Sequence, residues 1–285
     1  MIVNSKQMLI EAKEGKYAIP HFNINNLEWT RFILEECNEL KSPVILGVSE
    51  GAAKYMGGFN VISSMVKNLV LSLDIKIPVA IHLDHGSSYD VCKQAIDAGF
   101  TSVMIDASKY SLEENVNITK EVVTYASGRN VSVESEIGHI GGEEDGVSSD
   151  IAYAKVEDAV YLVNETKIDT LAPAVGSVHG IYKGEPKLDF ERMQEISNKI
   201  NLPLVLHGGS GIDDEKIKKA IECGICKLNI NTDLQIAWAN EVRKFLNENQ
   251  SVYDPRKIIK SGEKAIKEVI RLKVELLGSK NKVLD

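Results

Sequence analysis

The sequence predicts an α/β fold, a closed (β/α)₈ barrel of the TIM type with a C-terminal helical extension. Short apolar runs alternate along the chain with longer amphipathic stretches, which is the pattern of repeated βα units. The chain has 285 residues, enough for one barrel of roughly 250 residues with additions. We therefore expect one domain over residues 1–285, in which residues 254–285 form a helical tail.

Eight runs of apolar residues predict the strands, and a segment with helical periodicity follows each of them. In chain order, the expected strands are Tyr17–Asn23, Val44–Val48, Val79–Leu83, Ser102–Ile105, Val131–Glu136, Thr170–Val175, Leu204–Leu206 and Ile225–Ile230. The expected helices are Leu27–Leu40, Asn60–Leu73, Tyr89–Ala98, Leu112–Ala126, Val156–Thr166, Phe190–Ile200, Asp213–Cys223 and Asp233–Asn247. A short helix is expected before the first strand. An open doubly wound sheet is disfavoured, because it usually has five or six strands and a Gly-x-Gly-x-x-Gly turn that this sequence lacks.

Composition limits the compartment and the partners. The chain is 44% hydrophobic and 26% charged, with no apolar run of about 18 residues that could cross a membrane. A net charge of −8 disfavours nucleic acid and anionic membranes as partners. The N-terminus does not resemble a secretion signal, and four cysteines do not make a disulfide framework here, so we expect a cytoplasmic protein. Cys223 and Cys226 match C-x-x-C, but we interpret them as small buried side chains.

Three of the six histidines follow expected strands: His85, His179 and His207. Each comes where an apolar run gives way to a glycine-bearing loop. In a parallel barrel these strand ends open onto one face, where active sites are built. Converging imidazoles are preferred ligands of a catalytic zinc, which takes three protein ligands and leaves one position open.

Carboxylates accompany these histidines. Asp84 precedes His85, and strict alternation would put the two on opposite faces, so we expect His85 to lie just past its strand on a loop. Asp106 ends the fourth strand, where it could contact a metal or cap the next helix. Glu134 and Glu136 alternate and share a face; because an unpaired buried charge is costly, metal contact explains at least Glu136.

Two turns after the last strands predict an anion site, since phosphate sites in barrel enzymes recur there. They are residues 208–211 (GGSG) and residues 229–233 (NINTD). Lys183 and Arg256 could add positive charge, or could be ordinary surface cations. The glycine-rich acidic segment 138–150 is either a disordered surface excursion or a lid that carries a general base, Glu143 or Glu144.

Taken together, these motifs resemble the class II, metal-dependent fructose-bisphosphate aldolases and the related tagatose-bisphosphate aldolases. The runs that carry the resemblance are AIHLDHGSS, SVMIDASKYSLEENV, VSVESEIGHIGGEEDGV, LAPAVGSVHGIYKG, LVLHGGSGI and KLNINTDLQ. The likeness spans nearly the whole chain, from YAIPHFNINN to DPRKIIK. It implies a (β/α)₈ barrel, a homodimer or homotetramer, and a phosphosugar substrate.

The resemblance also implies roles for individual residues. His85, His179 and His207 would hold zinc, and Asp106 and Glu136 would offer a second divalent position. Asp84 would exchange the proton at the aldehyde oxygen, and Glu144 would be the loop base. The residues expected to bind substrate are Asn23, Ser49, Gly180, Lys183, Gly208, Gly209, Ser210, Asn229, Ile230, Asn231, Thr232 and Arg256. Whether the protein also uses a monovalent cation is left open.

The function implied is zinc-dependent, reversible cleavage of fructose 1,6-bisphosphate to dihydroxyacetone phosphate and glyceraldehyde 3-phosphate, a reaction of glycolysis. Tagatose 1,6-bisphosphate is the alternative substrate. A non-catalytic barrel that binds a sugar phosphate is a remote alternative function. A Schiff-base aldolase would need a lysine inside the barrel, and Lys227 is the only candidate. A zinc hydrolase usually has a His-x-His pair on an early strand, which the first strand lacks.

Overall fold

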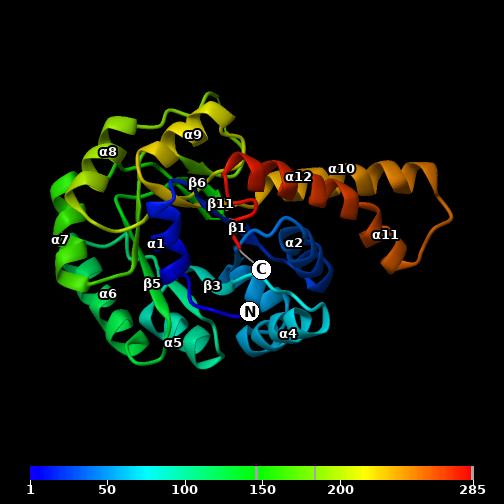
Figure 1. The fold of residues 1–285 in the computed structure, drawn as a ribbon, viewed down its shortest axis with the longest axis horizontal. Helices are drawn as coiled ribbons and strands as arrows, with labels where there is room; N and C mark the ends of the chain where they lie inside the picture. Colours follow the sequence, from blue (N-terminus) through cyan, green and yellow to red (C-terminus); the bar gives the residue numbers. More distant parts are fainter. Residues whose placement is uncertain (145–146, 183, 284–285) are drawn as a thin grey trace.

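A computed structural model shows eight parallel strands closed into a barrel within the described part of the chain, residues 1–144, 147–182 and 184–283 (Figure 1). The side chains of residues 143–149 are outside the description. Around the barrel the strands follow the order β1-β11-β10-β8-β5-β4-β3-β2. Their bounds are β1 Ile19–Asn23, β2 Val44–Val48, β3 Val79–Gly86, β4 Ser102–Ile105, β5 Ser132–Ile137, β8 Thr170–Pro173, β10 Leu204–Leu206 and β11 Ile225–Ile230. The predicted fold is confirmed.

Helices surround the barrel as the alternation predicts. Their bounds are α1 Lys6–Glu14, α2 Leu27–Glu39, α3 Glu50–Tyr55, α4 Phe59–Ser72, α5 Tyr89–Asp97, α6 Leu112–Ala126, α7 Val156–Thr166, α8 Phe190–Lys199, α9 Asp214–Glu222, α10 Thr232–Glu248, α11 Pro255–Ser261 and α12 Glu263–Leu276. The expected helices agree with these to within a residue or two. The sequence did not predict the short helix α3, which is among the described elements of this ring. No helix in the described ranges is both long and apolar enough to cross a membrane.

The two ends of the barrel differ in chemistry. At one end, α1 buries Met8, Leu9 and Ala12 against Ile19 and Ile45 of the strands. This apolar cluster lies where α1 crosses the starts of the strands (Figure 1). The opposite end, where the strands finish, carries the polar groups. A large apolar cluster between the strands and the outer helices supplies the main core.

The C-terminal extension leaves the barrel and returns to it. The arm formed by α10 and α11 projects away from the strands, and α12 runs back alongside α10 toward α2 (Figure 1). There Lys267 Nζ donates to Glu35 at 2.8 Å and Arg271 Nη2 donates to the buried Glu36 at 2.6 Å. Helix α12 therefore covers the barrel beside α2.

A small second sheet lies outside the barrel. It joins β6 Gly141–Glu144, β7 Val147–Ser149 and β9 Val178–His179 in the order β7-β6-β9. The acidic segment that was expected to be loop thus forms an antiparallel hairpin, and β6 pairs in parallel with β9. Since Gly142 faces His179 in this pairing, the hairpin is attached directly to one of the three predicted ligands.

Candidate active site and metal centre

His85, His179 and His207 converge at the ends of the strands. The ring centroids of His85 and His207 are 4.6 Å apart, those of His85 and His179 are 4.9 Å apart, and those of His179 and His207 are 5.7 Å apart. One nitrogen of each ring lies within 4.8 Å of the others, close enough for all three to bind one metal ion. The predicted convergence is confirmed.

A backbone irregularity brings His85 into this group. The expectation that His85 lies on a loop past its strand is wrong, since β3 continues to Gly86. Instead, the register between β3 and β4 shifts between Leu83 and Gly86, and His85 has a left-handed backbone with φ of 50°. This bulge breaks the strict alternation of side chains, so that Asp84 and His85 both reach the mouth of the barrel.

In two of the three rings, the nitrogen that points away from the other rings (the outer nitrogen) is hydrogen-bonded to a carboxylate. His85 Nδ1 donates to Asp106 Oδ2 at 2.9 Å, and His207 Nε2 donates to Glu134 Oε1 at 2.9 Å. With those protons placed, the inner nitrogens, His85 Nε2 and His207 Nδ1, carry lone pairs that face each other across 2.8 Å. A shared cation relieves that repulsion, and a carboxylate behind a ligating imidazole is the usual second layer of a zinc site. The residues present therefore fit a catalytic zinc with one open position.

Asp106 and Glu136 form a second group with His85, in which one donor atom of each lies within 4.8 Å of the others. Burial raises the pKa of the Glu136 carboxyl to about 8, and the neighbouring Asp106 adds to the rise. Burial also acts to raise the pKa of Asp106, but hydrogen bonds from His85 and Ser108 outweigh it and hold that pKa below its ordinary value. Glu136 Oε2 is buried without a hydrogen-bond partner among the described residues. Oxygen ligands of this kind could hold a second divalent ion.

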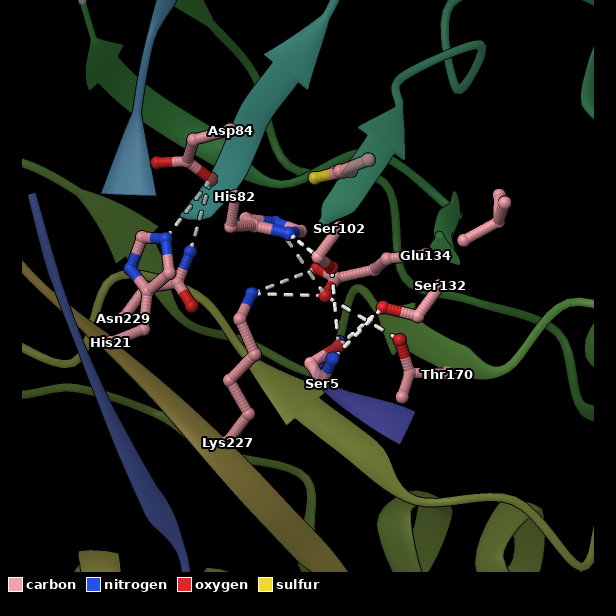
Figure 2. Close-up of polar contacts among 12 residues, drawn as sticks. Ser5, His21, His82, Asp84, Ser102, Ser132, Glu134, Thr170, Lys227 and Asn229 are labelled. Atoms are coloured by element: carbon pink, nitrogen blue, oxygen red, sulfur yellow. Dashed lines mark hydrogen bonds and ion pairs between the residues drawn. The ribbon is translucent and has the colours of Figure 1, made fainter. Parts of the chain in front are cut away.

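Asp84 is buried beside the histidines and is held by amides. Asn23 Nδ2 donates to its Oδ2 at 2.9 Å, and Asn229 Nδ2 donates to its Oδ1 at 3.2 Å. His21 Nε2 lies 4.0 Å from Oδ1 (Figure 2). Burial acts to raise the pKa of this carboxyl, but the surrounding imidazoles hold it well below its ordinary value. The carboxylate therefore has a fixed orientation next to the candidate metal centre.

The two turns expected to bind phosphate are joined by hydrogen bonds. Ser210 Oγ accepts from Asp233 N in the first turn of α10 at 3.1 Å, and Gly209 N donates to Asn229 O at 2.9 Å. A Cβ at Gly208 would lie 2.1 Å from the carbonyl oxygen of Val178, so that turn packs directly on the β9 segment. The glycine turn and the start of α10 are thereby brought to the side of the barrel mouth that carries His179 and His207.

The remaining predicted residues differ in their surroundings. Ser49 is buried and caps α3 through a hydrogen bond from Ala52 N at 3.2 Å. Gly180 follows His179 with a left-handed φ of 81°. Arg256 lies on α11 of the arm, away from the barrel mouth of its own chain, and its guanidinium bonds Asp254. The side chain of Glu144 and the whole of Lys183 lie outside the described residues.

The sequence did not predict which polar side chains contact one another inside the barrel. Lys227 is bonded to Glu134, and His21 and His82 pack edge to face with centroids 5.4 Å apart (Figure 2). Lys227 was expected as the one candidate for a lysine inside the barrel, because it interrupts the apolar run ICKLNI, but its partner was not predicted. The histidines carried no such signal, because nothing in the sequence says which face of a strand lines the barrel.

Comparisons with known proteins agree with this geometry. The family model described as "Fructose-bisphosphate aldolase class-II" matches residues 3–282. Fructose-bisphosphate aldolases from Geobacillus stearothermophilus and from Staphylococcus aureus (strain Mu50) are each 57% identical to this chain over 282 residues. Each match covers 99% of this chain, together with 98% of the Geobacillus protein and 99% of the Staphylococcus protein.

Solved structures agree as well. The YdjI aldolase from Escherichia coli K12 superposes with a TM-score of 0.85 at 32% identity, with all of both chains covered. The fructose-bisphosphate aldolase of Campylobacter jejuni superposes with a TM-score of 0.83 at 27% identity, with 99% of this chain and 97% of that one covered. The chain belongs to the class II fructose-bisphosphate aldolase family.

Proposed function

We propose that this chain catalyses the reversible, zinc-dependent cleavage of fructose 1,6-bisphosphate to dihydroxyacetone phosphate and glyceraldehyde 3-phosphate. The observation that carries the proposal is the convergence of three imidazoles beside a buried, amide-held carboxylate. The full-length similarity to enzymes named fructose-bisphosphate aldolase supports the same substrate.

His85, His179 and His207 would hold the zinc ion. When bound, that ion supplies Lewis-acid stabilisation of negative charge on the ketose. Asp106 and Glu136, with His85, would offer a second divalent position. A requirement for a monovalent cation is a further prediction, and activity assays in potassium and in tetramethylammonium salts would test it.

Asp84 would move the proton of the C4 hydroxyl. In cleavage it takes that proton as the C3–C4 bond breaks, and in condensation it returns the proton to the aldehyde oxygen. The amides of Asn23 and Asn229 hold both carboxylate oxygens, so the acceptor is oriented before the substrate arrives. Glu144, on the hairpin tied to His179, is proposed as the group that exchanges a proton with carbon.

The phosphate on the dihydroxyacetone side would lie against the glycine turns and the start of α10. The proposed contacts are Gly180, Gly208, Gly209, Ser210, Asn229, Ile230, Asn231 and Thr232, with Ser49 at the other phosphate. Backbone amides at a helix start and in a glycine turn are suited to phosphate. Such remote contacts hold the ketose in register with Asp84.

Asn23, Lys183 and Arg256 remain proposals for substrate contact. The Asn23 side chain is hydrogen-bonded to Asp84, so its proposed effect on the substrate is through the orientation of that carboxylate. Arg256 would have to serve a site other than that of its own barrel, because α11 lies at the far end of the arm (Figure 1).

We also propose a homodimer or homotetramer in the cytoplasm. The arm exposes large apolar side chains, among them Ile236 at 45% and Tyr253 at 91%, that a second copy could cover. The four cysteines are free, which suits a reducing compartment. Light scattering on the purified protein would measure the number of chains.

The substrate is tested by measuring kcat/KM for fructose 1,6-bisphosphate and tagatose 1,6-bisphosphate side by side, with triose phosphate release as the readout. The two ketoses differ in configuration at C4, the hydroxyl that Asp84 must reach. We expect the higher value for the fructose compound, with some activity on both, since one hydroxyl placement discriminates modestly. A higher value for tagatose bisphosphate would reassign the substrate and leave the metal chemistry intact.

A further inference from the structure

Lys227 and Glu134 form an ion pair inside the barrel, below the three histidines. Lys227 lies on β11 and Glu134 on β5, and their side chains are 1% and 2% exposed. Lys227 Nζ donates to both carboxylate oxygens, at 2.9 Å to Oε2 and 3.2 Å to Oε1 (Figure 2). The aldol reaction as proposed above does not use either group. A buried ion pair adds little net stability compared with apolar residues of the same volume, so a gain in folding stability does not explain why the pair is present.

The same carboxylate supports one of the candidate metal ligands. Glu134 Oε1 accepts from His207 Nε2 at 2.9 Å, in addition to its contact with Lys227. An ionised carboxylate has no hydrogen to donate, so the proton in this contact belongs to His207 Nε2. The opposite nitrogen, Nδ1, then keeps its lone pair. It points to His85 Nε2 at 2.8 Å, on the side where the three imidazoles meet.

Asn229 provides independent support for this proton placement. Its Nδ2 lies 3.2 Å from His207 Nδ1 and also donates to Asp84. An amide nitrogen has only hydrogens to offer, so His207 Nδ1 must be the acceptor in that contact. Contacts on both sides of the ring therefore require the same tautomer.

We infer that Lys227 and Glu134 are positioning residues that fix His207 in the Nε2–H tautomer, so that Nδ1 is the atom presented to the metal. The inference rests on the proposed function in one respect, that His207 is a zinc ligand. Lys227 acts by binding both oxygens, which fixes the plane of the carboxylate and favours its charged, accept-only form. In this arrangement Lys227 is engaged by Glu134 and is not a Schiff-base nucleophile.

Glu134→Gln separates positioning from packing. The amide has nearly the shape of the carboxylate but has one accepting and one donating end. Lys227 attracts the amide oxygen, which turns the amide nitrogen toward His207 Nε2 and forces that atom to accept. The proton of His207 must then move to Nδ1. We expect the zinc affinity of this variant to fall by about 10- to 100-fold, the usual effect of losing a partner behind a metal ligand.

Adding Lys227→Met to Glu134→Gln should recover most of the lost affinity. Without the ammonium group, the amide can turn its oxygen toward His207 Nε2 and restore the Nε2–H tautomer. If the pair only filled space, a second substitution in the same buried cluster would instead lower the affinity further or leave it unchanged. Ser132→Ala is the matched control, because Ser132 is buried in the same interior, bonds Ser5 and does not contact His207.

The experiment measures zinc dissociation constants by competition with a chromogenic chelator, for the full chain and each variant. Long-range ¹H–¹⁵N spectra of the metal-free proteins report the tautomer of each histidine, and His207→Gln assigns the signal of His207. We expect Nε2–H in the parent chain and in the double variant, and Nδ1–H in Glu134→Gln. An unchanged Nε2–H signal and unchanged zinc affinity in Glu134→Gln would overturn the inference.

Two further variants keep the result interpretable. Should Glu134→Gln fail to fold, Lys227→Met alone supplies the test: a mixture of tautomers and weaker zinc binding support the inference, and a pure Nε2–H signal with parental affinity contradicts it. His207→Ala tests the proposed function separately. If that variant binds zinc as tightly as the parent, His207 is not a ligand and the proposed site is wrong; if it loses zinc while Glu134→Gln does not, only the inference fails.

Discussion

At the scale of single residues, the distinctive feature is that Asp84 is held by side-chain amides and not by a cation. Asn23 and Asn229 donate to its two oxygens, and no lysine or arginine of the described chain forms an ion pair with it. An amide orients a carboxylate without neutralising it. Asp84 therefore keeps the charge that a proton acceptor needs while it stays in one place.

Asp84→Ala should lose about 10²- to 10⁴-fold in kcat, the usual contribution of a positioned acid–base group. Zinc content and the thermal unfolding midpoint should stay close to those of the parent, because the three histidines, and not Asp84, would bind the metal. Steady-state kinetics and metal analysis on the same preparation check both points. Loss of zinc together with turnover would show that the role assigned to Asp84 is wrong.

The sequence identified which residue types matter at the site, but not how the chain brings them together. His85, His179 and His207 could be predicted, since each follows an apolar run that had to be a strand. The bulge that admits both Asp84 and His85 could not, because a register shift between β3 and β4 depends on hydrogen bonds between distant segments. The partner of Lys227 was hidden for the same reason.

At the scale of elements, the pairing of β6 with β9 ties the acidic hairpin to His179. Gly142 has a left-handed φ of 103°, and a Cβ there would lie 2.3 Å from the carbonyl oxygen of His179. Only glycine allows the two backbones to approach so closely. The sequence suggested a lid here but gave no strand signal, because a run of glycines and acidic residues has low strand propensity.

Gly142→Ala should weaken zinc binding and lower turnover, because the added methyl group pushes β9 and displaces His179. Gly58→Ala is the control: Gly58 has a nearly equal φ of 107° but open space around its Cβ position. Both variants pay a backbone cost of about 1–3 kcal/mol, so both should melt earlier. Zinc titration distinguishes them, and equal zinc affinities in the two variants would contradict the proposed link between the hairpin and His179.

At the scale of the whole molecule, the chain leaves the barrel after β11 and comes back to cover it with α12. Ile266, Ile270 and Val274 of α12 are fully buried. Sequence periodicity predicted the barrel well, because eight strand–helix units repeat one local pattern. It predicted a helical tail but not its course, since the direction of a helix after a loop depends on tertiary packing. The return of α12 to α2 is therefore a finding of the structure.

Ile270→Ala should destabilise the protein by about 2–5 kcal/mol, the usual cost of removing a large buried aliphatic side chain. Leu272→Ala, two residues further on, removes a side chain that is 57% exposed and should change stability little. Denaturant unfolding midpoints of the two variants provide the comparison. Equal midpoints would mean that α12 is not part of the cooperative core of the barrel.

The most direct test of the account is triose phosphate release from fructose 1,6-bisphosphate by the chelated protein as zinc is added back. We predict no turnover in the metal-free protein and a rise to a plateau at about one zinc ion per chain, as expected for a single three-histidine catalytic site. His85→Ala, His179→Ala and His207→Ala should each fail to reach that plateau. Full turnover in a protein shown to be free of metal would contradict the account.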